Sequence, residues 1–365
     1  MAQSAKAAIL REPRTQFVIE DVALDEVQPN EVLVRVEACG VCHTDAFAMQ
    51  ALPVPSVLGH EGAGQVEAVG KNVTSVRPGD TVIISYPSCG GCANCLAKRP
   101  FICEQIIDLK FAGHRADGSS TIRAGGQPIT SAFFQQSSFA THAVTLETNL
   151  ISVPRKWKAE ILAALPCGVL TGAGSILNIF KHQKRASLAV IGVGAVGMSA
   201  IMAAKLLGVR PLIAIDVNPE RLEMARQLGA THILNAHDPD LIKLARTVTP
   251  SGIDYILDTS GHESAIANAI GMIAMGGELA LVTIPEPYPS SETHLNQFFM
   301  KAGTIRCVIV GASDPRVLLP QLLEWYDKGR FPIDRLVTTY PFASINAAFA
   351  EAKAGKVIKP VLLMN

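Results

Sequence analysis

Four of the eight cysteines of this 365-residue chain lie in one short segment with the spacing C-x2-C-x2-C-x7-C: Cys89, Cys92, Cys95 and Cys103. The short gaps let consecutive thiolates converge on one ion, and two glycines inside the segment let the backbone wrap tightly around it. Four thiolates in a tetrahedral array suit Zn²⁺, and four protein ligands leave no coordination position for a substrate. The spacing therefore predicts a closed, structural zinc site.

Three other uses of these thiols have to be weighed. An iron–sulfur cluster is the strongest rival, but ferredoxin-type runs close with a three-residue gap and a proline, whereas the last gap here has seven residues. A redox C-x-x-C motif usually occurs as a single pair near the start of a helix. Disulfide bonds are disfavoured, because a chain of this length needs no covalent staple and the cytosol keeps thiols reduced.

A second chemical signal is the pattern G-x-G-x-x-G, which follows an expected strand over Ser187–Ile191 and begins a helix. The first glycine allows a tight turn, the second lets the backbone approach a pyrophosphate, and the third lets helix and strand pack closely. The free N–H groups at the start of the helix favour phosphate oxygens. We expect this turn to bind a dinucleotide through Gly192, Gly194, Val196 and Gly197.

An acidic residue follows at the distance that such a dinucleotide site requires. Asp216 ends the next expected strand, 19 residues after Gly197, where a carboxylate accepts hydrogen bonds from the ribose hydroxyls. The same charge repels a 2′-phosphate, so the sequence favours NAD over NADP. Arg221 is expected either to flank the ribose or to cap a surface helix.

The elements that position these residues fall into two groups. Up to about Thr171 the chain is β-rich, and the Gly-, Ser- and Gln-rich segment from Arg115 to Gln136 predicts a long loop. After Thr171, short apolar strands alternate with helices, which is typical of a parallel, doubly wound sheet. We expect an α/β protein with three ranges: a β-rich domain over 1–168, a Rossmann domain over 169–307, and a return to the first domain over 308–365.

Composition and charge exclude several classes of protein. With 48% hydrophobic and 18% charged residues, the chain is that of a compact globular protein. A net charge of zero gives no reason to expect a nucleic acid or an anionic membrane as partner. Apolar runs are interrupted before the roughly 20 residues of a membrane span, and neither end carries a recognisable targeting signal. We expect a cytoplasmic enzyme that acts on a small molecule.

Three further segments bear the resemblance to a known family: "GVCHTD", "GHEGAGQVEAVG" and "LPCGVLTGAG". Together with the glycine pattern, they make the chain similar to the zinc-dependent medium-chain alcohol dehydrogenases, essentially from end to end. The details "CHTD", "FFQQSSFATHA" and "CGVLTGAGSILN" resemble most the aryl-alcohol (benzyl-alcohol) dehydrogenase branch. The resemblance implies a GroES-like catalytic domain, a Rossmann coenzyme domain, and two zinc ions per chain.

The resemblance also assigns roles to residues at the second zinc site. It implies that Cys42, His60 and Cys167 bind a catalytic zinc ion, which polarises an alcohol. The hydroxyl of Thr44 would carry the alcohol proton outward. Asp45 would orient His60 by a hydrogen bond.

Further roles in the resemblance concern neighbours of this site. Glu61 would lie next to the zinc and could approach it from behind, while His43 and Lys359 would lie near the cofactor pyrophosphate. Some members of the family end the proton relay with a histidine five residues after the first zinc cysteine, and this chain has Phe47 there. The loop that begins at Arg115 resembles that of dimeric members, so a homodimer is expected.

The sequence therefore predicts an NAD-dependent zinc enzyme that interconverts primary allylic or aromatic alcohols and aldehydes. The alternatives are a biosynthetic reductase or non-redox member of the same fold, a glutathione-dependent formaldehyde dehydrogenase, or a non-catalytic cofactor-binding protein. Cys39 and Cys307 receive no role in the resemblance and are expected to be buried thiols.

Overall fold

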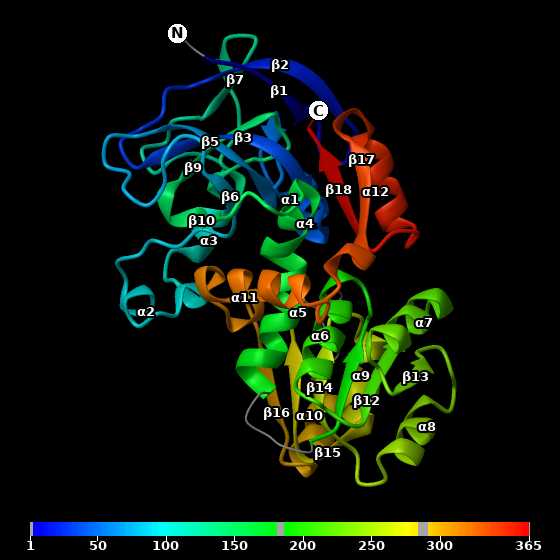
Figure 1. Ribbon diagram of the computed structural model, residues 1–365. Helices are drawn as coiled ribbons and strands as arrows, with labels where there is room; N and C mark the ends of the chain where they lie inside the picture. The colour runs from blue at the N-terminus through cyan, green and yellow to red at the C-terminus, as the bar shows by residue number, and fades with distance from the viewer. Residues whose placement is uncertain (1–2, 181–185, 284–290, 365) are drawn as a thin grey trace. The chain divides into compact units, whose positions relative to one another are not determined.

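The computed structural model describes residues 3–180, 186–283 and 291–364, and it divides the chain into two compact units (Figure 1). The first unit comprises Met1–Cys167, Asp314–Leu323 and Pro332–Asn365, and the second comprises Gly168–Ser313 and Glu324–Phe331. The chain leaves the first unit one residue before the expected boundary at 168. It returns at Asp314 instead of 308, and 324–331 belong to the second unit because helix α11 (Pro315–Asp327) runs across the division.

Two sheets form the first unit. One has the order β4-β1-β2-β7-β8, and the other has the order β10-β6-β5-β3-β18-β17, with β9 also paired to β3. The last strand pairs antiparallel with β3, so the C-terminal segment lies in the first unit. The strands are β1 Gln3–Leu10, β2 Phe17–Leu24, β3 Glu31–Gly40, β4 Ser56–Val57, β5 Gly62–Val69, β6 Thr81–Ile84, β7 Ile122–Ala124, β8 Gln127–Pro128, β9 His142–Leu146, β10 Leu150–Val153, β17 Val337–Pro341 and β18 Lys359–Leu363.

Short helices connect these strands. Among the residues to which the sequence assigned chemistry, they carry His43, Thr44, Asp45 and Cys95. The helices are α1 His43–Ala51, α2 Ala93–Leu96, α3 Ile106–Phe111, α4 Ala159–Ala164 and α12 Ile345–Lys353.

The second unit contains one six-stranded, fully parallel sheet with the order β13-β12-β11-β14-β15-β16. This order is that of a Rossmann fold, which confirms the predicted doubly wound class. The central strands are buried on both faces, as their continuous apolar sequences require. The strands are β11 Leu188–Ile191, β12 Leu212–Asp216, β13 His232–Asn235, β14 Ile253–Asp258, β15 Ile273–Leu281 and β16 Thr304–Cys307. The helices are α5 Leu170–Gly174, α6 Ala195–Leu206, α7 Pro219–Leu228, α8 Leu241–Val248, α9 Glu263–Met272 and α10 Ser291–Met300.

Two expectations about apolar segments need correction. The helical stretch Ala159–Phe180 is long and apolar enough to cross a membrane, although the sequence suggested no such stretch, but 83% of its most apolar window is buried in the protein. It is therefore a core helix. Cys307, expected in the core, lies exposed on β16, because this strand is the edge of its sheet and all four of its residues face solvent.

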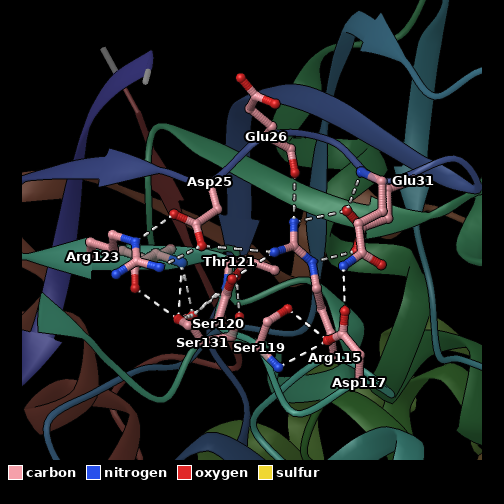
Figure 2. Close-up of polar contacts among 12 residues, drawn as sticks. Asp25, Glu26, Glu31, Arg115, Asp117, Ser119, Ser120, Thr121, Arg123 and Ser131 are labelled. Atoms are coloured by element: carbon pink, nitrogen blue, oxygen red, sulfur yellow. Dashed lines mark hydrogen bonds and ion pairs between the residues drawn. The ribbon is translucent and has the colours of Figure 1, made fainter. Parts of the chain in front are cut away.

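The segment expected to be a long loop is instead held to the sheet by a buried arginine (Figure 2). Arg115 binds both carboxylate oxygens of Glu31, at 2.8 and 2.9 Å, and donates to the carbonyl oxygens of Glu26 and Ser120. The segment then adds β7 and β8 to the edge of a sheet. The sequence missed these strands because they are only three and two residues long.

This contact predicts a large and specific loss of stability. Arg115→Ala leaves the Glu31 carboxylate buried without its cation, and we expect the free energy of unfolding to fall by about 3–5 kcal/mol. Urea denaturation followed by circular dichroism measures this change.

The matched control lies in the same cluster. Arg123 pairs with Asp25 at 2.7 Å, but its side chain is 43% exposed, so Arg123→Ala should lower the free energy of unfolding far less than Arg115→Ala does. Equal losses in the two variants would show that burial of the Arg115 pair is not what holds this segment.

Candidate active site

The start of helix α1 brings two of the predicted site residues together. Cys42 precedes the first residue of the helix, and its backbone N–H donates to the Asp45 carboxylate at 3.0 Å. The Asp45 N–H donates back to the Cys42 carbonyl at 3.1 Å. This reciprocal cap satisfies helix-terminal groups that would otherwise lack partners. It also fixes the direction in which the Cys42 thiol leaves the backbone.

The same carboxylate orients His60. Asp45, which is fully buried, lies 2.8 Å from His60 Nδ1 and also accepts the N–H of Gly59 at 3.2 Å. Because Nδ1 is engaged by a carboxylate, the other ring nitrogen is the one available as a ligand. His60 Nε2 is buried and has no hydrogen-bond partner among the described residues. Gly59 has φ +91°, and a Cβ there would overlap Phe139, so only glycine fits before this histidine.

Cys167 completes the set from a different part of the chain. It lies in a single π-helical turn, Leu165–Val169, an irregularity that often marks functional sites. Its Sγ is 3.7 Å from Cys42 Sγ. Their hydrogen bond is the main cause that lowers the pKa of Cys42 and raises that of Cys167, so one proton is lost before the other.

Glu61 and Lys359 form a buried ion pair beside these thiols. The Lys359 ammonium donates to Glu61 Oε2 and, at 3.3 Å, to the Val41 carbonyl. Burial raises the pKa of Glu61 to about 7, although the lysine opposes this. The sequence placed Lys359 near a cofactor pyrophosphate; in the structure its ammonium is buried against Glu61, and the contact with the pyrophosphate stays a prediction.

The donor set fits a zinc ion. One ligand atom each from Cys42, His60, Glu61 and Cys167 lie within 4.8 Å of one another. His60 Nε2 and Glu61 Oε1 are both buried without partners, and they are 3.9 Å apart. Burial lowers the pKa of His60, yet Asp45 and Cys42 together raise it to about 10. Negative groups that attract a proton to this nitrogen also attract a metal cation, and thiolates with imidazole are the ligands that zinc prefers.

The four-cysteine segment forms a second, separate cluster. The four Sγ atoms of Cys89, Cys92, Cys95 and Cys103 lie within 4.8 Å of one another. All eight cysteines are free thiols. Backbone N–H groups, that of Glu104 foremost, lower the pKa of Cys92 to about 6, which favours the thiolate form that a metal requires.

Aromatic rings surround the imidazole of His60, and the sequence had not singled them out. The ring centroid of Phe134 lies 4.6 Å from that of His60, and Phe133 lies at 5.6 Å. Phe111 contacts both phenylalanines, and Phe47 contacts Phe111. Their separation in the chain hid this cluster from sequence reasoning.

A buried glutamine, also missed, holds the backbone at His60. Gln136 donates to the carbonyl oxygens of His60 and Ser85, at 3.0 and 3.3 Å, and accepts the N–H of Gly62 at 3.1 Å. Phe134 has φ +52°, in the left-handed region that few residues with a side chain adopt. Such strain persists where surrounding contacts determine the backbone.

The other predicted residues of α1 lie around this group. Thr44 Oγ1 is 3.8 Å from Cys42 Sγ, so its hydroxyl is next to the metal-binding set. His43 is exposed at the first helical position. Phe47 is 45% exposed and packs edge-on against Phe111. No histidine occupies the place of the relay residue.

The glycine turn of the second unit has the geometry expected for a dinucleotide. Gly192 has φ +81°, and a Cβ on Gly197 would overlap the Gly192 carbonyl oxygen. Nothing lies within 4 Å of a Cβ on Gly194, which is therefore open toward a ligand. The turn ends at helix α6, where Val196 lies in the first turn and the first N–H groups are free of intrahelical acceptors.

Asp216 lies at the end of β12 beside this turn, as predicted. Its carboxylate accepts the N–H of Val193 at 2.7 Å and the N–H of Asn218 at 2.8 Å. Asn218 in turn caps helix α7 through the N–H of Arg221. Thr259 was not predicted, but its hydroxyl donates to the Gly192 carbonyl at 2.6 Å and holds the turn from the neighbouring strand.

Comparisons with known proteins agree with this geometry. Residues 28–155 match the alcohol dehydrogenase GroES-like domain, and residues 195–328 match the zinc-binding dehydrogenase domain. Geraniol dehydrogenase of Castellaniella defragrans is 40% identical over 99% of this chain and 98% of its own length.

Two solved structures cover the whole chain and are themselves covered completely. An alcohol dehydrogenase zinc-binding domain protein from Burkholderia ambifaria superposes with a TM-score of 0.96 at 40% identity. Benzyl alcohol dehydrogenase from Acinetobacter calcoaceticus superposes with a TM-score of 0.94 at 34% identity.

Proposed function

The chain belongs to the zinc-dependent medium-chain alcohol dehydrogenases, and we propose that it interconverts primary allylic or aromatic alcohols and their aldehydes with NAD. It is an oxidoreductase that acts on alcohols. The proposal concerns the substrate class, the choice of NAD, two zinc ions per chain, and the roles of individual residues.

One observation carries the proposal. His60 Nε2 is buried without a partner and lies among two thiols and a carboxylate that come from distant parts of the chain. Leaving such a nitrogen unpaired costs about 1–3 kcal/mol. A bound cation removes that cost, and the intermediate exposure of Cys42 and Cys167 gives a small molecule access to it.

The residues of the chain then have distinct tasks. When bound, zinc would supply a Lewis acid for the alcohol oxygen and NAD would supply a hydride acceptor. Asp45 holds the His60 ring and the Cys42 backbone in place, and Lys359 balances the charge of Glu61. The Thr44 hydroxyl would accept the alcohol proton and release its own proton to water, so that it remains a neutral hydroxyl. Because position 47 is phenylalanine, no imidazole stands at the relay position of α1 to take that proton further.

Two observations support allylic or aromatic alcohols as substrates. The ring of His60 is surrounded by phenylalanines, and flat, unsaturated groups pack favourably against aromatic faces. Two relatives are named geraniol dehydrogenase and benzyl alcohol dehydrogenase.

The first test combines metal analysis with turnover. The wild-type chain should contain two zinc ions and oxidise benzyl alcohol and geraniol. Cys42→Ala should lose one zinc and at least about a thousandfold in kcat/KM, since a Lewis acid contributes several kcal/mol. Cys95→Ser should lose the other zinc and lower the unfolding free energy, because a structural metal adds directly to stability.

Cys39→Ala is the matched control, because Cys39 is buried close to Cys42 in sequence but belongs to neither cluster. It should retain both zinc ions. Full activity of Cys42→Ala, or iron in place of zinc, would refute the assignment. Activity only with formaldehyde plus glutathione would support a glutathione-dependent formaldehyde dehydrogenase. Activity only in the reduction of a substrate, with no alcohol oxidised, would support a biosynthetic reductase.

The second test concerns the cofactor. NADH should bind at least about tenfold more tightly than NADPH, because the Asp216 carboxylate binds ribose hydroxyls and repels a phosphate. Asp216→Ala should reduce this preference, as measured by equilibrium fluorescence titration.

Asp258→Ala controls for local loosening of the fold. Asp258 is a buried carboxylate at the end of β14 that also accepts backbone N–H groups, from Ser260 and Gly261. Its loss should lower stability without changing the preference between the two nucleotides. If both variants alter the preference equally, Asp216 has no specific role.

We also propose a homodimer. Strand β16 is the edge of its sheet, its residues are exposed, and nearby apolar side chains are exposed as well: Met275, Phe299, Met300 and Ile305. Open apolar edges tend to pair with another chain. Sedimentation should show twice the chain mass of 38.8 kDa, and Ile305→Lys should favour the monomer. Val317→Lys, at another exposed apolar residue, should not.

Location in the cytoplasm stays a prediction of the sequence.

A further inference from the structure

Lys110, on helix α3, is a buried cation without an anion. Three cationic side chains are buried among the described residues: Lys110, Arg115 and Lys359. Arg115 pairs with Glu31 and Lys359 pairs with Glu61. Lys110 is 7% exposed and forms neither an ion pair nor a hydrogen bond within the described chain. Burying an unpaired charge is costly, so the position requires an explanation.

Aromatic rings hold the ammonium in place but do not neutralise it. Lys110 Nζ lies 5.5 Å from the ring centroid of Tyr86 and 5.3 Å from that of Phe134. Cation–π contacts compensate for only part of the lost hydration. Burial accordingly lowers the pKa of Lys110 to about 8, against the attraction of Cys167, and the group is still mainly protonated at neutral pH. Its three N–H donors are without acceptors.

The ammonium lies next to the metal-binding set. A single ring, that of Phe134, contacts both Lys110 and His60. The charge of Cys167 also acts on Lys110. A molecule that reaches from these metal ligands past one aromatic ring therefore meets the ammonium.

Further contacts hold the segments that carry Lys110 and its aromatic neighbours. Tyr86 comes three residues before Cys89, and Lys110 comes seven residues after Cys103, so the four-cysteine cluster joins the segments that carry them. The Gln135 side chain donates to the carbonyl oxygen of Leu109 at 3.2 Å and thereby ties α3 to the turn that carries Phe134.

We propose that Lys110 binds a carboxylate of the substrate, at the end remote from the reacting carbon. The substrates are then primary alcohols, or their aldehydes, that carry a carboxylate beyond an aromatic or unsaturated spacer. This inference rests on the proposed function and narrows its substrate class. The spacer packs among the phenylalanines, and the carboxylate supplies the acceptor that the buried ammonium lacks.

The test compares 4-(hydroxymethyl)benzoate with 4-methylbenzyl alcohol, which has the same shape without the charge. The wild-type enzyme should favour the carboxylate. Lys110→Met retains the aliphatic part of the side chain but loses the ammonium. It should lower kcat/KM for the carboxylate substrate by about 10- to 100-fold, which is the effect of losing one hydrogen bond to a charged group. It should leave the neutral alcohol within about threefold. Lys110→Arg should restore part of the preference.

Binding without turnover gives a second readout. Calorimetric titration of the zinc-loaded protein with 4-(hydroxymethyl)benzoate, in the absence of nucleotide, should show binding that Lys110→Met abolishes. Glutathione is the other possible source of a carboxylate, and turnover of formaldehyde with glutathione tests it. If Lys110→Met lowers kcat/KM in that reaction alone, glutathione is the ligand of Lys110. Lys156→Met is the matched control, since Lys156 lies over the Trp157 ring at 4.3 Å on the surface.

The possible failures can be told apart. Equal losses for charged and neutral alcohols, or unchanged kinetics with both, would overturn the role of Lys110. A changed affinity for NADH alone would overturn it too. If no alcohol is oxidised but the carboxylate still binds through Lys110, the proposed reaction is wrong and the binding site stands. Urea denaturation of each variant identifies any loss that comes from unfolding.

Discussion

The Asp45 carboxylate is the contact on which the candidate active site depends. It accepts the N–H of Cys42, the N–H of Gly59 and the ring of His60. One fully buried charge thus caps a helix, fixes a turn and selects the nitrogen that His60 offers. Because all three donors satisfy the same carboxylate, the loss of any one leaves a buried charge less well solvated. The helix, the turn and the metal ligands are therefore stabilised together.

Charge balance determines the rest of the site. Two thiols and the Glu61 carboxylate lie close together, and Lys359 alone does not neutralise them once the thiols ionise. A divalent cation would complete the balance at the place where the unpaired acceptors of His60 and Glu61 converge. The Arg115–Glu31 pair illustrates the opposite case: there the charges are matched within the chain, and the contact serves the fold.

The four-cysteine cluster and the active site are linked through α3. The cluster is separate from the reacting centre, yet the segments on either side of it carry Tyr86 and Lys110. A metal ion bound by its four thiols would therefore support more than a surface lobe. It would also restrain a buried ammonium and the Tyr86 ring, next to phenylalanines that contact His60.

The sequence by itself determined the fold class, and it located the glycine turn, the acid that follows it and the two groups of candidate metal ligands, because each depends on local spacing or on a motif. It did not reveal Gln136, the phenylalanines around His60 or the buried charge of Lys110, since these depend on distant segments that meet only in the folded chain. It misplaced Cys307, which is exposed on an edge strand, and it did not show that Lys359 is buried against Glu61. Both depend on the strands beside these residues, which only the tertiary structure decides.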